Sequence, residues 1–216
     1  MEPFESPLHF ILHHYGRAGD LELIMVAAQR TETALRDLQA DRIAEARVQW
    51  SSVEGEALLD AWDNVTRRIA EVGPRWDPQR PRPTGPVGTK VTPSVARRIY
   101  ERDRYRCRYC QMPIFTRTKG SPLRGLIRSF PDLTPNLTLA GDSLTGTGIG
   151  GAIRNVDYAK FLWSLAAPDH IHPRSLGGNA TPENLVSSCS GCNYAKGDLT
   201  LGQMGVRSPL PLDLLP

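Results

Sequence analysis

Apolar residues in the first third of the chain recur at the spacing of an α-helix. One stripe steps by four residues and includes Val53, Ala57, Ala61, Val65 and Ile69. Ser51, Ser52 and Gly55 interrupt this pattern. The spacing predicts two helices, over about residues 20–48 and 53–71, which form an antiparallel hairpin or pair with another chain.

A proline-rich segment separates this helical region from the rest of the chain. Residues 73–86 contain five prolines, two glycines and three arginines. Such a composition does not pack as helix or sheet and favours an extended, semi-rigid tether. We therefore expect an α-helical N-terminal arm over residues 1–72, a linker over 73–90 and a second domain over 91–216.

The second domain should begin with a capped helix. Thr92 followed by Pro93 is typical of a helix N-terminus, and this helix should lead into a turn. Residues 112–167 are predicted to be an insertion that ends in a short helix over about 155–166.

A β-β-α pattern follows the insertion. We expect strands over 169–172 and 184–188, with a loop at Gly177 and Gly178 between them. A short helix should follow the second strand. The predicted fold class is α+β.

The charge of the chain is unevenly distributed. Residues 1–78 hold 8 Lys and Arg against 14 Asp and Glu, a net charge of −6, whereas residues 79–216 hold 18 against 9, a net charge of +9. The basic portion favours a polyanionic partner such as nucleic acid, and the acidic portion should repel it. No apolar run approaches the roughly 20 residues of a membrane span. With no recognisable signal peptide, we expect a cytoplasmic protein without membrane contact.

All four cysteines occur in two CxxC pairs. They are Cys107, Cys110, Cys189 and Cys192. Structural disulfides are rare in the cytoplasm, and a redox CxxC motif normally occurs once. Two such pairs are what a tetrahedral four-cysteine site requires, because the two intervening residues let a tight turn direct both thiolates at one ion. The spacing predicts structural zinc.

Residues 168–198, which read PDHIHPRSLGGNATPENLVSSCSGCNYAKGD, resemble the HNH endonuclease family. Arg97–Gln111 resembles it more loosely, and residues 1–90 do not. The resemblance implies a small zinc-stabilised ββα-metal (HNH) nuclease module, here preceded by the N-terminal α-helical hairpin. The last His of the family pattern is replaced by Asn193, whose amide oxygen can still ligate a hard cation. A carboxylate and an amide favour Mg²⁺ or Mn²⁺ over Zn²⁺ at this position.

The residue types in this segment suit phosphodiester hydrolysis. His170, with an ordinary pKa of about 6.5, can accept a proton from water. Asp169 and Asn193 are predicted to hold one divalent cation that stabilises the leaving oxygen. The resemblance assigns Asn184 a structural role, in which it ties the loop after the first strand and orients His170.

A second assignment of the base remains open. Adjacent side chains of a regular strand face opposite ways, so Asp169 and His170 serve one phosphate only if the strand end bends around the metal. His170 and His172 would share a face. His172 is therefore the alternative base or a second metal ligand.

Basic side chains near these motifs are candidates for nucleic-acid contact. Arginine forks suit phosphate oxygens, and the segment from Arg97 to Arg108 interleaves arginines with tyrosines. The candidates are Arg97, Arg98, Arg104, Arg106, Arg174 and Lys196, with Arg102 and Arg108 in the same basic segment. A solvated helix face is the alternative interpretation.

These patterns together predict a metal-dependent endonuclease that acts on DNA and leaves 5′-phosphate and 3′-hydroxyl ends. One alternative is a four-cysteine zinc-ribbon module that binds nucleic acid without cutting it. Another is a partner-dependent nuclease subunit of a restriction or phage-defence system. In that case the acidic helical arm would dock on a protein partner or form a homodimer.

Overall fold

The computed structural model describes residues 2–72, 89–140, 143–146 and 155–214 of the chain. Its α-helices are α1 (Pro7–Tyr15), α2 (Asp20–Gln39), α3 (Ile43–Ser51), α4 (Gly55–Val72), α5 (Pro93–Arg102), α6 (Pro122–Ser129), α7 (Val156–Leu162), α8 (Ser190–Lys196) and α9 (Leu201–Met204). Its strands are β1 (Leu137–Ala140), β2 (Ser143–Gly146), β3 (Ala166–His170) and β4 (Leu185–Cys189). The fold is α+β, with many helices and two small antiparallel sheets, as predicted.

The described residues divide into two compact units, each built from separate stretches of sequence. Unit 1 comprises Met1–Arg17, Asn64–Gln111 and Ala166–Pro216, and unit 2 comprises Ala18–Asp63 and Met112–Leu165. The β-β-α segment and both cysteine pairs lie in unit 1. The predicted boundary at 73–90 stays a prediction, because residues 73–88 lie outside the described part of the chain.

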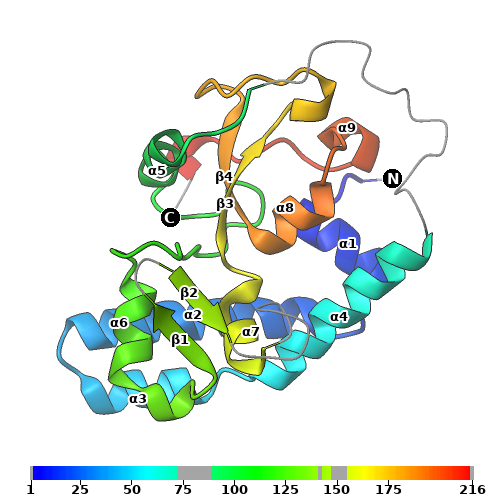
Figure 1. Cartoon of the computed structure of the whole chain (residues 1–216). Coiled ribbons are helices and arrows are strands. Elements are labelled where there is room, and N and C mark those ends of the chain that lie inside the picture. Colours follow the sequence, from blue (N-terminus) through cyan, green and yellow to red (C-terminus); the bar gives the residue numbers. More distant parts are fainter. Residues whose placement is uncertain (1, 73–88, 141–142, 147–154, 215–216) are drawn as a thin grey trace. The chain divides into compact units, whose positions relative to one another are not determined.

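The β3–β4 hairpin is the centre of unit 1 (Figure 1). Its antiparallel register runs from Ala166 opposite Cys189 to His170 opposite Leu185. Every residue of β4 is buried. Helix α5 packs against both strands, and α8, which follows β4 directly, also packs against both. The expected strand–loop–strand–helix order is therefore confirmed, although the strands begin and end one to three residues from the predicted limits.

Helix α1 was not predicted, and it forms part of unit 1. Ser6 caps it, since the Ser6 hydroxyl accepts a hydrogen bond from the backbone of His9, and Pro7 occupies the first turn. The apolar face of α1 buries Leu8 and Ile11 and packs against α8. The N-terminal segment also pairs with the C-terminal one, since Phe4 forms a bridge with Val206.

Unit 2 contains most of the predicted hairpin region. Helices α3, α6 and α7 each pack against α2. Trp62 and Trp163 meet edge to face at 4.8 Å, and the Trp163 indole donates a hydrogen bond to the backbone carbonyl of Leu58. The described residues of the predicted insertion, up to Leu165, thus share a unit with residues 18–63.

The single helix predicted over residues 20–48 is wrong. The helix breaks after Gln39, and a second helix begins at Ile43. Asp41 lies between them with a φ of 58°, in the left-handed region that ends helices. Arg42 then donates hydrogen bonds to Asp37. The break depends on this local conformation, which apolar periodicity does not reveal.

Asp103 is a hub of buried polar contacts in unit 1. Its side chain is fully buried and accepts hydrogen bonds from Arg102, from Arg108 and from the backbone N–H of Ser187 in β4. Arg102 also donates to the carbonyl of Leu185. The contact of Arg102 and Arg108 with phosphate is thus not supported, because these guanidinium groups bind Asp103 and backbone carbonyls instead.

The Thr92 cap was predicted correctly. Its side chain accepts a hydrogen bond from the backbone of Val95, and Pro93 is the first residue of α5. Among the described residues no helix is both long enough and apolar enough to cross a membrane.

The change Asp103→Ala should lower the free energy of unfolding by about 3–5 kcal/mol, because it leaves the buried guanidinium of Arg108 and the half-buried one of Arg102 without their counter-charge. Urea denaturation of zinc-loaded protein measures this. Glu101→Ala is the matched control, since Glu101 pairs with Arg97 on the exposed face of the same helix. It should change stability by about 0.5 kcal/mol or less. Equal effects of the two changes would contradict the role of Asp103.

Candidate metal centre and active site

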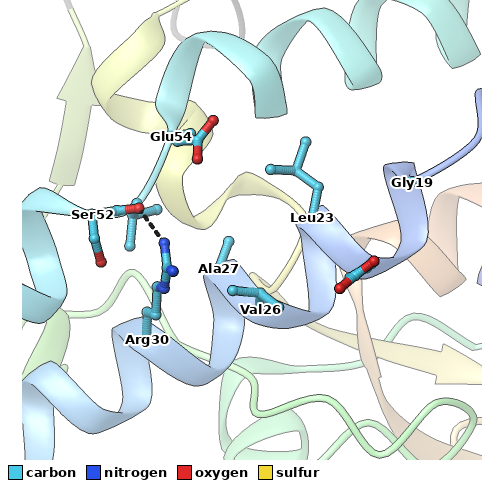
Figure 2. Close-up of a pocket in the computed structure, with 9 residues that line it drawn as sticks. Gly19, Leu23, Val26, Ala27, Arg30, Ser52 and Glu54 are labelled. Carbon is cyan, nitrogen blue, oxygen red and sulfur yellow. Dashed lines mark hydrogen bonds between the residues drawn. The ribbon is translucent and has the colours of Figure 1, made fainter.

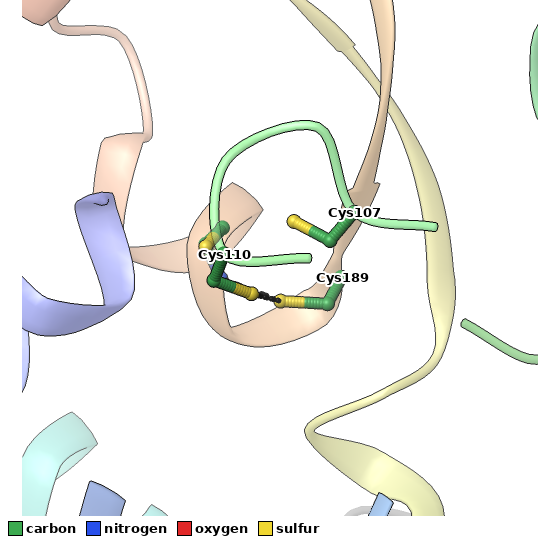
Figure 3. A group of neighbouring side chains, drawn as sticks. Cys107, Cys110 and Cys189 are labelled. Carbon is green, nitrogen blue, oxygen red and sulfur yellow. Dashed lines mark hydrogen bonds between the residues drawn. The ribbon is translucent and has the colours of Figure 1, made fainter. Parts of the chain in front are cut away.

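The four cysteine sulfurs converge in unit 1. All four side chains are buried, and their sulfur atoms lie within 4.8 Å of one another. Figure 3 shows Cys107 and Cys110 on the loop after α5, facing Cys189 at the end of β4; the sulfurs of Cys110 and Cys189 are 3.8 Å apart. Four sulfurs about 2.3 Å from one ion at tetrahedral angles are about 3.8 Å apart. The cluster therefore has the composition and the spacing of a structural zinc site.

Local backbone geometry explains why the cysteines converge. Cys189 is the N-cap of α8, and its sulfur accepts a hydrogen bond from the backbone N–H of Cys192 at 3.3 Å. In the other pair the backbone N–H of Gln111 donates to the carbonyl of Cys107, and Gln111 has a φ of 63°. Each CxxC segment is thus a tight turn that directs two sulfurs to the same side.

The thiols influence one another strongly. Burial opposes ionisation of Cys107, but hydrogen bonds from the other three cysteines lower its pKa well below the usual range. Hydrogen bonds with Cys107 and Cys189 raise the pKa of Cys110, and burial raises that of Cys192. One thiolate is therefore favoured at the expense of its neighbours. A divalent cation removes this competition, because coordination favours the deprotonated form of every ligand.

Asp169 points into the interior of unit 1. It is 6% exposed, and one carboxylate oxygen, Oδ2, accepts a hydrogen bond of 2.6 Å from the hydroxyl of Tyr109. The Lys196 ammonium lies 3.3 Å from Oδ2 and 3.4 Å from Oδ1. Burial raises the pKa of Asp169, whereas the charge of Lys196 and the Tyr109 hydrogen bond oppose this rise. Burial also raises the pKa of Tyr109, so the phenol remains a donor.

His170 lies beside the segment that precedes α5. Its Nε2 is 3.2 Å from the backbone carbonyl of Thr89. A carbonyl oxygen only accepts, so this contact requires a hydrogen on Nε2 and leaves the Nδ1 lone pair as the acceptor. Burial lowers the pKa of His170, which favours the neutral ring.

Asn184 holds the loop between the two strands. Its amide oxygen accepts from the backbone N–H of His172 at 2.8 Å, and its amide nitrogen donates to the carbonyls of His172 and Asn179. Gly178 closes the same loop, where an added Cβ would lie 1.9 Å from the carbonyl of His172. These bonds are of the kind expected for a loop-tying role. The ring of His172 contacts the carbonyl of Leu176.

The strand does not bend between Asp169 and His170. Both residues remain paired with β4, and the next backbone N–H, that of Ile171, still bonds to the carbonyl of Asn184. Their side chains therefore leave opposite faces of the strand, Asp169 toward Tyr109 and His170 toward Thr89. The bend that would place both over one face is not present.

The predicted cation ligands lie on elements that pack together. Asp169 is on β3, and Asn193 is on α8 directly after Cys192. Oδ1 of Asp169 has only the long Lys196 contact, and the half-buried amide of Asn193 makes no hydrogen bond within the described residues. Both oxygens thus have acceptor capacity of the hard type that Mg²⁺ and Mn²⁺ prefer, so the donor set fits such a cation.

Lys196 does not lie at the surface, where the predicted phosphate contact would require it. Its side chain is 0% exposed, and its ammonium donates to the backbone carbonyl of His170 at 2.7 Å besides pairing with Asp169. The other candidates stay near the surface. Arg97, Arg98 and Arg104 are exposed, whereas Arg106 and Arg174 are half-buried.

Sequence reasoning missed two contributors, Tyr109 and Thr89. Tyr109 lies between the first two cysteines, and this position in the sequence could have indicated that its side chain contacts the site. No sequence pattern pointed to Thr89, because its contacts are with residues far away in the sequence. Its carbonyl lies beside the ring of His170, and its hydroxyl accepts a hydrogen bond from the backbone N–H of Ala180.

A hollow of about 300 Å³ lies in unit 2 (Figure 2). Leu23 and Ala27 of α2 line it, together with Glu54, and Arg30 donates to the backbone carbonyl of Ser52 at its edge. None of the predicted catalytic or metal-binding residues borders this hollow, so it plays no part in the candidate site.

Residues 160–199 match the family model of the HNH endonuclease. The match covers β3, the loop, β4 and α8, and it confirms the resemblance seen in the sequence. No curated protein and no solved structure matches the chain.

The cysteine cluster should bind one zinc ion per chain, and Cys110→Ser should lose that ion together with cooperative unfolding. A structural zinc site contributes about 10 kcal/mol or more in small zinc-binding peptides, so unit 1 should not fold stably without it. Elemental analysis and thermal unfolding measure the two effects. Ser190→Ala, within the second CxxC pair, removes no thiolate and should keep the zinc. Full zinc content in Cys110→Ser would contradict the assignment.

The change Lys196→Met should lower the free energy of unfolding by about 3–5 kcal/mol, because it leaves the Asp169 carboxylate buried without a counter-charge. Adding Asp169→Asn to this variant should restore part of the loss. The two changes should therefore be non-additive by about 0.5–3 kcal/mol in equilibrium denaturation. Strict additivity would show that the buried pair is not formed.

Proposed function

We propose that this protein is a metal-dependent endonuclease of the HNH type that hydrolyses phosphodiester bonds in DNA. The observation that carries the proposal is the HNH match over residues 160–199, which coincides with a β-β-α unit next to four converging cysteines. A purely structural zinc module needs neither the Asp169–His170 pair nor an asparagine directly after its last cysteine.

His170 is the general base. Its contact with Thr89 places the hydrogen of a neutral ring on Nε2, so that Nδ1 is the nitrogen that takes a proton from the attacking water. The lowered pKa keeps the ring unprotonated at neutral pH. His172 is less suited to this role, because one of its ring nitrogens contacts the loop carbonyl of Leu176.

Asp169 and Asn193 hold one divalent cation, Mg²⁺ or Mn²⁺, which supplies charge stabilisation to the phosphate and to the departing 3′ oxygen. Asn184 keeps the loop beside His170 in place through its three backbone bonds. Since Asp169 and His170 leave opposite faces of β3, the scissile phosphate must lie across the end of the strand. The products are 5′-phosphate and 3′-hydroxyl ends.

DNA is the proposed substrate because of charge. The portion from residue 79 onward carries a net charge of +9, and Arg97, Arg98 and Arg104 expose their side chains on and just after α5. Guanidinium groups at these positions favour contact with phosphates. Arg106 and Arg174 are proposed as further contacts.

The acidic N-terminal portion is proposed to face a protein rather than DNA. Its net charge of −6 repels a polyanion. A partner subunit of a restriction or defence system, or a second copy of the chain, suits this surface better.

Purified protein should convert supercoiled plasmid to nicked or linear DNA in the presence of Mg²⁺ or Mn²⁺, and His170→Ala should lower the rate by about 10²–10⁴-fold because the general base is lost. Gel electrophoresis of time courses measures the rate. His13→Ala is the matched control, since His13 is exposed on α1, and it should keep the wild-type rate.

Plasmid and single-stranded substrates that stay intact with every cation would contradict the nuclease proposal. If the protein then still retards DNA in a mobility-shift assay, the zinc-ribbon binding module becomes the better account.

A further inference from the structure

We propose that Tyr109 is a positioning residue that transmits the geometry of the cysteine cluster to the cation ligand Asp169. This inference rests on the proposed endonuclease function. It concerns a side chain that contacts neither substrate nor cation and acts only through Asp169.

The position of Tyr109 in the sequence fixes where its ring lies. It is the residue directly before Cys110, inside the first CxxC turn, and it is 4% exposed. When the four sulfurs converge, the turn is held against β4 and α8. The phenol then reaches β3 and donates the 2.6 Å hydrogen bond to Oδ2 of Asp169.

The hydrogen bond leaves the other carboxylate oxygen for a cation. Among the described residues, Oδ1 of Asp169 contacts only the Lys196 ammonium, at 3.4 Å. A carboxylate anchored through one oxygen keeps the lone pairs of the second in a fixed direction. The Tyr109 bond therefore orients the oxygen that the proposed cation needs.

Lys196 cannot replace Tyr109 in this role. Its ammonium carries a positive charge beside Asp169, so a divalent cation at Oδ1 repels it. The neutral phenol experiences no such repulsion. Tyr109 is thus the anchor that remains compatible with a bound cation, whereas the Lys196 contact weakens when the cation binds.

The change Tyr109→Phe should weaken Mn²⁺ binding about 10-fold or more, as is usual when a group that orients a metal ligand is removed, while the zinc content stays at one per chain. Titration calorimetry of zinc-loaded protein with Mn²⁺ measures the affinity. Asp169→Ala supplies the baseline, because it removes one of the two ligand oxygens of the proposed site. The half-saturating Mn²⁺ concentration for plasmid cleavage should rise by the same factor.

Tyr158→Phe is the matched control. Tyr158 is also buried, and its hydroxyl accepts a hydrogen bond from Arg117, but it lies in unit 2, whereas the proposed site lies in unit 1. This variant should bind Mn²⁺ and cut DNA as the wild type does. Any loss caused merely by removing a buried hydroxyl would appear here too.

The outcomes separate the inference from the function on which it rests. If wild type binds Mn²⁺ and cuts DNA but Tyr109→Phe has the same Mn²⁺ affinity, the positioning role is overturned and the endonuclease proposal stands. A lower melting temperature of Tyr109→Phe without a change in its Mn²⁺ affinity also overturns the positioning role. If wild type and Asp169→Ala bind Mn²⁺ equally, the proposed cation site fails, and the inference fails with it.

Discussion

Convergence of four buried thiols is the constraint on which unit 1 depends. Cys110 and Cys189 are 79 positions apart in sequence, yet their sulfurs lie 3.8 Å from each other. Helices α5 and α8 pack against the hairpin that carries Cys189, and the short α1 packs on α8. A zinc ion held by the four sulfurs would stabilise unit 1 and fix where β4 ends and α8 begins.

Buried polar contacts connect the cysteine cluster to the candidate active site. From the first cysteine turn Tyr109 extends to Asp169, and from α8, four residues after Cys192, Lys196 extends to the same carboxylate. A buried carboxylate is costly unless its partners are supplied, and here both partners come from elements that the cysteines hold. Asp103 is likewise buried, and its hydrogen bonds with Arg102 and with the backbone N–H of Ser187 join α5 to β4. Two buried aspartates, Asp169 and Asp103, thus connect the elements of unit 1 through hydrogen bonds and ion pairs.

Local signals made much of this predictable. The cysteine spacing, the Thr92 cap and the β-β-α order are each encoded within a few residues, and the structure bears all three out. Contacts that depend on tertiary burial were not predictable. The sequence gives no sign that three predicted surface cations pair with buried aspartates. Lys196 pairs with Asp169, and both Arg102 and Arg108 pair with Asp103. The break at Asp41 was missed because apolar periodicity continues across it, and α1 was missed because it is short.

We propose that cysteine convergence places Asp169 and Asn193 around one cation beside His170. A crystal structure with Mn²⁺ and a short DNA duplex, with anomalous diffraction recorded at the zinc and manganese absorption edges, tests it most directly. Zinc should lie about 2.3 Å from all four sulfurs. Manganese should lie about 2.2 Å from Oδ1 of both Asp169 and Asn193, with a phosphate oxygen in the same shell. Manganese bound elsewhere would contradict this placement of the cation. An Asp169 carboxylate that still pairs with Lys196, with the phosphate distant from His170, would contradict it too.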